Sequence, residues 1–535
     1  MTPSAARGGA AWARRHKNLL IIAGLVAACL AIDFLVFRTL QSHNLTSGTS
    51  LTGLYLAVFV PLTVAVPGLW YLIFVKRIRT ESVFLLAATV FGLMLMLVRA
   101  PYTWFDENDH IYLAIYYSDV ALGAEHGMNE EGQLTWVGRA EDANDNNLSS
   151  GAFSYHATNV GDYQLLARDF FAPEREPGKT TTLAVDDVGV FYQYLPATVG
   201  VTIAHLLHLG KVATLYLGKL FSLAFYILMV YLAIRISPKR FKTLFALLGL
   251  IPFILASAGT YSYDNMINVL SFLLIASVLR LAYDAENVRA RDIVLLALLG
   301  TLLAPLKYVY VPLLFLPLII PKEKWPRAHF RLYWCMGISL LGFAAIGLLT
   351  LNQAALEATR ATADQSIDSY YPDAYTFKTF FEHPMVALRL LGHSIFQYIN
   401  LIIDTPSGFT FSSRLPTWTH YLIFALLILS SSFNGKTRDA DQPALFKMRK
   451  SARLIMLGLS VVVYLLVLLA SINWTNVGAP LLTGVQGRYF IPLLPLLVIA
   501  VSGFIQPTRD LGRVSLYLFS CLSGLDLFFT FISVT

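Results

Sequence analysis

Charged residues are scarce in this chain of 535 residues: they occupy 14% of the positions, whereas hydrophobic residues occupy 56%. A soluble domain of ordinary composition carries about 25% charged residues. The deficit excludes a soluble globular protein, and many apolar runs of about 20 residues indicate a multipass membrane protein. The net charge of +7 does not indicate nucleic-acid binding, because the basic residues lie between apolar runs and not on one face.

Cysteine is also scarce, since only Cys29, Cys335 and Cys521 occur and each lies inside an apolar run. This placement excludes a disulfide framework. The chain also lacks a nucleotide-binding P-loop, a dinucleotide-binding fingerprint and a hydrolase nucleophile elbow, so nothing in it indicates ATP-driven transport. The first apolar run is too long for a signal peptide and has no small-residue cleavage site, so we expect an uncleaved first span.

The apolar runs predict an all-α polytopic membrane protein with about thirteen transmembrane segments. Segment 293–320 is too long for one helix and is interrupted by Pro305-Leu306-Lys307, so it counts as two short helices, 293–306 and 308–320. The other expected spans are 18–37, 53–75, 83–100, 212–235, 243–259, 266–283, 332–351, 418–433, 454–472, 489–505 and 514–532.

Lysine and arginine predict the orientation of these spans. With the N-terminus in the cytoplasm, the connections assigned to the inner side hold 24 of the 40 basic residues, as the positive-inside rule requires. The expected location is the cytoplasmic (inner) membrane of a bacterium, with two large loops, 101–211 and 352–417, outside the cytoplasm. Segments 195–210 and 385–404 are expected to be amphipathic helices lying at the outer surface.

The first outer loop is acidic, with 16 carboxylates between Asp106 and Asp187 against four basic residues. It opens shortly after Arg99, at the end of the third span. In a helix that starts here, Asp106, Asp109 and His110 share one face, which suits a general base or a metal ligand. A structural alternative makes Thr103 the N-cap, with Asp106 stabilising the first helical turn.

Two basic residues at the outer face of the membrane are further candidates. Lys307 lies at the break in segment 293–320, where irregular backbone requires protein or water around it. Arg488 follows Gly487 at the start of a span, and an arginine there suits a phosphate or serves as an interfacial anchor. The turn Tyr263-Asp264 lies between two spans at the same face, where Asp264 either contacts a ligand or caps the next helix.

Three motifs together resemble a family of bacterial multipass membrane proteins of formerly unknown function. They are Asp106-Glu107-x-x-His110, Tyr263-Asp264-Asn265 with Lys307, and the block from Thr483 to Pro495 containing Gly-Val-Gln-Gly-Arg-Tyr-Phe. The resemblance covers residues 83–505. The family motif usually reads Pro-Asp-Glu-Pro-x-His, whereas this chain has Phe105 and Asn108 in place of the prolines and an additional acid at Asp109.

That family in turn resembles the GT-C superfamily of glycosyltransferases, which use polyprenyl-phosphate sugars at the outer face of the membrane and invert the anomeric centre. The resemblance implies a GT-C-like module over 83–505, preceded by a two-span extension, 1–82, and followed by a final span in 506–535. It implies catalytic Asp106, Glu107 and His110; donor-phosphate binding by Arg488, Lys307 and Arg99; and substrate binding by Asp109, Tyr263, Asp264 and Gln486. The motif accommodates a divalent cation without requiring one, and the metal is left open.

An alternative function is a non-catalytic handler of lipid-linked glycans, either a flippase or a polymerase-like protein. A transporter is expected to have internal repeats and charges near the bilayer midplane, whereas here the charges gather towards the outer face. A receptor or scaffold with an acidic binding loop is a third interpretation, which leaves Lys307 and the Gly-Arg block without a role. The expected partners are the lipid-phosphate donor, the glycan or glycolipid acceptor and the bilayer, without nucleic acid.

Overall fold

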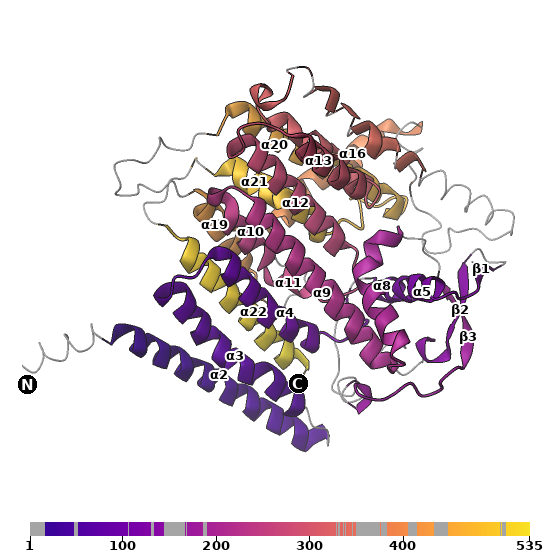
Figure 1. The fold of residues 1–535 in the computed structure, drawn as a ribbon, viewed down its shortest axis with the longest axis vertical. Helices are drawn as coiled ribbons and strands as arrows, with labels where there is room; N and C mark the ends of the chain where they lie inside the picture. Colours follow the sequence, from indigo (N-terminus) through magenta and orange to yellow (C-terminus); the bar gives the residue numbers. More distant parts are fainter. Residues whose placement is uncertain are drawn as a thin grey trace, which may run out of the picture.

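The computed structural model is a helical bundle with a small β-sheet at one side (Figure 1). It describes residues 16–47, 52–104, 106–129, 133–143, 166, 168–185, 190–327, 329, 332–334, 336, 337, 339–344, 346–348, 375, 382–404, 415–432, 448–502, 504 and 510–534. Most of the expected outer loop 352–417 lies outside these residues.

Seven helices are long and apolar enough to cross a membrane. They are α2 (Lys17–Ser47), α3 (Thr52–Trp70) with its π-helical continuation η1 (Tyr71–Val75), α4 (Thr80–Val98), α9 (Lys211–Ile236), α12 (Asp264–Tyr283), α20 (Lys450–Ala470) and α22 (Gly512–Val534). The prediction of a helical multipass membrane protein is therefore confirmed. Among the described residues the number of full-length spans is seven, or eight with a bent pair, and not the thirteen expected.

The bent pair replaces the single span that we expected over 243–259. Helix α10 (Lys242–Gly249), preceded by the short 3-10 helix η3 (Lys239–Phe241), meets α11 (Pro252–Ala258) at 70°. Ile251 is extended, with φ −59° and ψ 124°, because the ring of Pro252 disfavours the helical conformation in the residue before it. Proline then serves as the first residue of α11, where its missing N–H costs no hydrogen bond.

The predicted break in segment 293–320 is confirmed. Helix α13 (Ala290–Leu303) ends before it, Lys307 is extended with φ −163° and ψ 109°, and η4 (Tyr308–Ile319) follows. The second half is a 3-10 helix, not the expected α-helix, and it contains Pro312 and Pro317, which lack the N–H that an α-helical hydrogen bond needs. Helices α19 (Trp418–Ser432), η9 (Gly487–Leu493) and α21 (Leu494–Val501) are likewise short apolar elements.

Segment 101–211, which we expected as the first outer loop, contains an antiparallel sheet that the all-α prediction missed. It comprises β1 (His126–Met128), β2 (Leu134–Arg139) and β3 (Thr180–Val185) in the order β1-β2-β3, and the 3-10 turn η2 (Ala140–Asp142) follows β2. Side chains of β3 alternate, since Leu183 and Val185 are buried and Thr182 is exposed. The buried side chains join Trp136 and aromatic residues of α5 (Glu107–Ala121) in a second core.

Two helices lie where amphipathic surface helices were expected. Helix α8 (Phe191–Leu206) buries Ala197 and Val201 against α5 and α9, whereas Phe191 and Leu206 are exposed. Helix α16 (Pro384–Tyr398) and the short α17 (Leu401–Asp404) occupy the second segment. The helices are confirmed, and their position at the membrane surface stays a prediction. In Figure 1, α5, α8 and the sheet lie side by side at one edge of the bundle.

Candidate active site

The candidate site lies where chain segments that are far apart in the sequence meet. Arg488 at the start of η9 is 382 residues from Asp106, yet its Nη2 donates a hydrogen bond of 3.0 Å to Asp106 Oδ2. The same guanidinium reaches α12, because its Nε lies 3.4 Å from Asp264 Oδ2. The side chains are 7% exposed for Arg488, 13% for Asp264 and 51% for Asp106. Asp106 is therefore the member of this group that solvent reaches.

The backbone directs the Asp106 carboxylate towards this group. Asp106 is the N-cap of α5 in the left-handed conformation, with φ 54° and ψ 17°, and its side chain makes no capping hydrogen bond. The structural alternative with Thr103 as N-cap is wrong, because α5 begins at Glu107 and Thr103 donates to the carbonyl of Ala100 at 2.6 Å. The Asp106 side chain thus contacts Arg488 and does not cap the helix.

Lys307 supplies the second cation of the site. Its Nζ lies 3.6 Å from the ring centroid of Tyr489 and 5.6 Å from that of Tyr263, so it makes cation–π contacts with both rings. Tyr310 fixes this arrangement, because its hydroxyl donates to the Tyr489 carbonyl at 2.8 Å. Tyr489 adjoins Arg488, whose guanidinium carbon lies 5.4 Å from the same ring. The two cations therefore share one aromatic wall.

His110 lies behind the carboxylates and is 4% exposed. Its Nδ1 is 3.0 Å from the Tyr194 hydroxyl, and its ring meets Tyr263 edge to face at 5.1 Å. Burial lowers the pKa of His110 to about 4, and the nearby cations assist against the pull of Asp106 and Asp264. The imidazole of His110 is therefore neutral at neutral pH, so it can make hydrogen bonds but adds no positive charge to the site.

Glu107 is directed away from Arg488 and into the protein. Its carboxylate accepts hydrogen bonds from the backbone N–H groups of Trp104, at 3.1 Å, and Tyr261, at 3.3 Å. Burial raises the pKa of Glu107, against the opposing effect of Lys219 and the amide donors. The side chain ties the start of α5 to the connection before α12. These contacts are those of a structural anchor, and the catalytic role that the resemblance implies for Glu107 stays a prediction.

Arg99, expected at the donor phosphate, has a different partner. Its Nη2 lies 3.0 Å from Oδ2 of Asp526, a fully buried carboxylate of α22, and its guanidinium lies over Trp104 at 5.6 Å. An arginine engaged in this way joins the ends of two spans within an apolar environment. The observed contacts of Arg99 are therefore those of a helix–helix pair, and its role in phosphate binding stays a prediction.

The other residues expected to bind substrate take up different positions around the site. Tyr263 is the N-cap of α12 and contributes its ring to Lys307. Gln486 is the N-cap of η9, and its Oε1 is buried without a hydrogen-bond partner in the described part of the chain. Asp109 does not share a face with His110, because it is exposed where His110 is buried. Its surroundings form a groove that is treated below.

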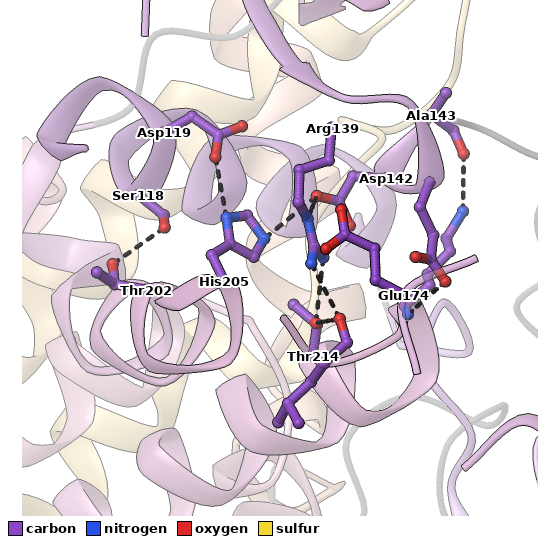
Figure 2. Close-up of polar contacts among 12 residues, drawn as sticks. Ser118, Asp119, Arg139, Asp142, Ala143, Glu174, Thr202, His205 and Thr214 are labelled. Atoms are coloured by element: carbon purple, nitrogen blue, oxygen red, sulfur yellow. Dashed lines mark hydrogen bonds and ion pairs between the residues drawn. The ribbon is translucent and has the colours of Figure 1, made fainter. Parts of the chain in front are cut away.

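The sequence did not reveal a second polar cluster, which lies at the other end of α5 (Figure 2). His205 of α8 is held between two carboxylates: its Nδ1 lies 2.9 Å from Asp119 Oδ1, and its Nε2 lies 3.2 Å from Asp142 Oδ2. Arg139 adds two hydrogen bonds of 2.9 Å to the Asp142 carboxylate, and Trp136 donates to Asp119 at 2.9 Å. The cluster fastens the sheet and η2 to α5 and α8.

The ionisation of this cluster follows from its geometry. Burial alone would lower the pKa of His205, but the two facing carboxylates outweigh it and the pKa is raised. Burial would raise the pKa of Asp142, but the hydrogen bonds and charges of His205 and Arg139 lower it to about 2. The charged forms of His205 and Asp142 therefore stabilise each other. The sequence did not point to this cluster because its members come from four separate segments, α5, β2, η2 and α8.

No cluster of three or more His, Cys, Asp or Glu side chains suited to a metal ion occurs among the described residues. At the candidate site, the guanidinium of Arg488 lies between Asp106 and Asp264, in the position where a cation bridging these carboxylates would sit. The arrangement can bind an anion beside an accessible carboxylate.

Comparison with known proteins gives one informative match. No curated protein and no solved structure matches the chain. Residues 89–497 match the model of a family described as predicted membrane protein (DUF2142). This stretch includes α5, α12, η4 and η9, which carry the candidate site. Because the match covers most of the 535 residues, the chain belongs to the DUF2142 family of predicted membrane proteins.

Proposed function

We propose that the protein is an inverting glycosyltransferase of the GT-C type. In this proposal it has about thirteen membrane segments and moves a sugar from a polyprenyl-phosphate donor to a cell-envelope glycan or glycolipid at the outer face of the bacterial cytoplasmic membrane. One observation carries the proposal: the half-exposed carboxylate of Asp106 is paired with the buried guanidinium of Arg488, and Lys307 lies on the same aromatic wall.

The two cations suit the phosphate of a lipid-linked donor. A guanidinium binds phosphate oxygens through two parallel hydrogen bonds, and a lysine adds a point charge. Lys307 immediately precedes η4 and Arg488 lies in η9, and both of these are short apolar elements. Asp264 keeps Arg488 in position from the opposite side, because it contacts Nε and leaves Nη2 for exchange.

In the proposed reaction the phosphate takes the place of Asp106 at Nη2 of Arg488. The freed carboxylate then accepts the proton of an acceptor hydroxyl as its oxygen forms a bond to the anomeric carbon. The bond between that carbon and the phosphate oxygen breaks on the opposite face, and polyprenyl phosphate leaves with the electron pair. Arg488 and Lys307 stabilise the charge that develops on it. His110, neutral and buried, supports the site through its contacts with Tyr194 and Tyr263.

The test uses the full-length protein in liposomes that contain a radiolabelled polyprenyl-phosphate sugar. Asp106→Asn keeps the size of the side chain but removes the base, so transfer falls by about 100-fold or more. Glu176→Gln is the matched control, since this exposed carboxylate of the same loop contacts only Lys179 among the described ion pairs. Full transfer by Asp106→Asn contradicts the base.

The lipid that copurifies with the protein distinguishes the alternative. Mass spectrometry is expected to find a polyprenyl phosphate. An intact oligosaccharide diphospholipid together with no transfer activity would instead favour a flippase.

A further inference from the structure

A polar groove opens beside Asp106, between the first turns of α5 and the sheet. Its volume is about 340 Å³, near the lower end of the range for small-molecule sites. The residues lining it are Asn108, Asp109 and Tyr112 of α5, Gln133, Ala143 and residues 182–185 of β3. On α5, Asn108 and Tyr112 are four residues apart and therefore lie on one face, and Asn108 follows Asp106 by two residues.

The opposite wall of the groove is the edge strand β3. Among the described residues β3 pairs only with β2, and four consecutive residues, 182–185, line the groove. Because successive side chains of a strand point to opposite faces, a run of four means that the main chain also borders the groove. An unpaired strand edge offers N–H donors and C=O acceptors in addition to the side chains.

The groove and the phosphate site differ in charge. Arg488 and Lys307 are the cations of the phosphate site, whereas the described residues that line the groove include one acid, Asp109, and no lysine or arginine. Asp106 pairs with Arg488 of the phosphate site and stands two residues before Asn108, the first residue of the groove lining. A phosphate or a uronic acid would therefore be repelled from the groove and attracted to the cations.

We infer that this groove binds the acceptor of the proposed transfer and that the acceptor is an uncharged sugar chain. The inference rests on the proposed function and deepens it by assigning the acceptor a place and a chemical class. Carboxylate, amide and hydroxyl groups are the partners that sugar hydroxyls need, and Tyr112 adds an aromatic ring. A chain lying in the groove would bring one of its hydroxyls to the exposed carboxylate of Asp106.

A peptide added to the edge of β3 is the competing ligand. Strand addition gains specificity from pockets for alternate side chains, which are usually apolar. Here the lining is mostly polar, which favours a sugar chain. The part of the lining at Ala143 is held in place, because Lys211 Nζ donates to the Ala143 carbonyl at 2.8 Å and Arg139 holds neighbouring Asp142 (Figure 2).

The test measures binding directly, without donor or turnover. The full-length protein in lipid nanodiscs is applied to an array of neutral oligosaccharides, uronic-acid oligosaccharides and extended peptides. The best neutral oligosaccharide is then titrated against two variants of β3. Thr182→Lys places a long cationic side chain in the groove and is expected to weaken binding by about tenfold or more. Thr180→Lys, exposed two residues away on the same face, is expected to change it by less than about twofold.

Binding of neutral oligosaccharides that Thr182→Lys weakens and Thr180→Lys does not would support the inference. Binding of peptides alone, of acidic sugars alone or of nothing on the array would overturn it, as would equal binding by both variants. The outcomes that contradict the proposed function are different from those that contradict the groove. If the neutral oligosaccharide binds but no sugar is transferred, the groove stands and the transferase does not. If transfer occurs with an unchanged acceptor KM in Thr182→Lys, the groove alone is wrong.

Discussion

Arg488 and Asp106 form an ion pair of 3.0 Å between one side chain that is 7% exposed and one that is 51% exposed. The two charges differ in their surroundings. Arg488 is buried and needs its carboxylate partners, whereas Asp106 can also be hydrated by water. Asp264 provides the arginine with a second carboxylate at 3.4 Å. The pair with Asp106 can therefore open without leaving Arg488 unpaired, as the proposed exchange with a phosphate requires.

Removal of this arginine is expected to act first on the donor. Arg488→Ala should raise the KM for the polyprenyl-phosphate sugar by about 30-fold or more, because a buried charge-assisted contact is worth 2 kcal/mol or more. Arg488→Lys keeps the charge without the planar fork and should give a smaller increase. Steady-state kinetics in liposomes measure both values.

The arginine variant also leaves Asp264 buried without its partner, so lower stability has to be separated from lower affinity. The double variant Arg488→Ala with Asp264→Asn should recover the thermal unfolding midpoint but not the affinity. A donor KM that returns to the wild-type value in this double variant would assign Arg488 a purely structural role.

Glu107 is expected to behave differently from its neighbour Asp106. Glu107→Gln keeps one acceptor oxygen for the amides of Trp104 and Tyr261 but replaces the other with a donor that faces an N–H group. The expected loss is about 1–3 kcal/mol in the free energy of unfolding. Thermal unfolding in detergent measures it, while kcat per folded molecule stays near that of the wild type. A large loss of kcat without a loss of stability would show that Glu107 takes part in the reaction.

The sequence predicted the positions of the helices well, because twenty apolar residues in a row have few alternatives to a span. It also predicted the break before Lys307, and it expected Asp106, Lys307 and Arg488 at one face of the membrane; the three do lie near one another, while their position relative to the membrane stays a prediction. It did not predict how the side chains pair. Asp106 and Glu107 are adjacent acids, and only the left-handed backbone at Asp106 sends one to Arg488 and the other to backbone amides.

The sheet and the His205 cluster were missed for related physical reasons. Strands β2 and β3 are separated by 40 residues, and short alternating segments are weak signals in a chain dominated by apolar runs. His205 and Asp119 are 86 residues apart, so their contact depends on the packing of α8 against α5. The bend at Pro252 was within reach of the sequence, since the residue before a proline rarely continues a helix.

The Arg99–Asp526 pair allows a test of whether Arg99 holds two helices together or binds the donor phosphate. Arg99→Leu removes the ion pair of 3.0 Å to the fully buried carboxylate of Asp526, so the free energy of unfolding should fall by up to about 3–5 kcal/mol. The double variant Arg99→Leu with Asp526→Leu should recover most of this loss, because two apolar side chains replace the pair. Donor KM should stay unchanged in the double variant. A higher donor KM there, despite recovered stability, would return Arg99 to the phosphate site.

The His205 cluster predicts how stability depends on pH. The folded pKa of His205 lies above its ordinary value of 6.5, so its contribution is complete below pH 6.5 and is lost as pH rises through the folded pKa. Asp142 contributes in the opposite direction of pH: its pKa falls from 3.8 to about 2, so its contribution to stability is complete above pH 3.8 and is lost as pH falls towards 2.

The difference in unfolding midpoint between wild type and His205→Gln should therefore be largest near pH 5–6 and shrink on the alkaline side. His208→Gln is the control, because this histidine is 79% exposed and its variant should show little change with pH. A difference for His205→Gln that grows as pH rises would mean that the imidazole is neutral in the folded protein.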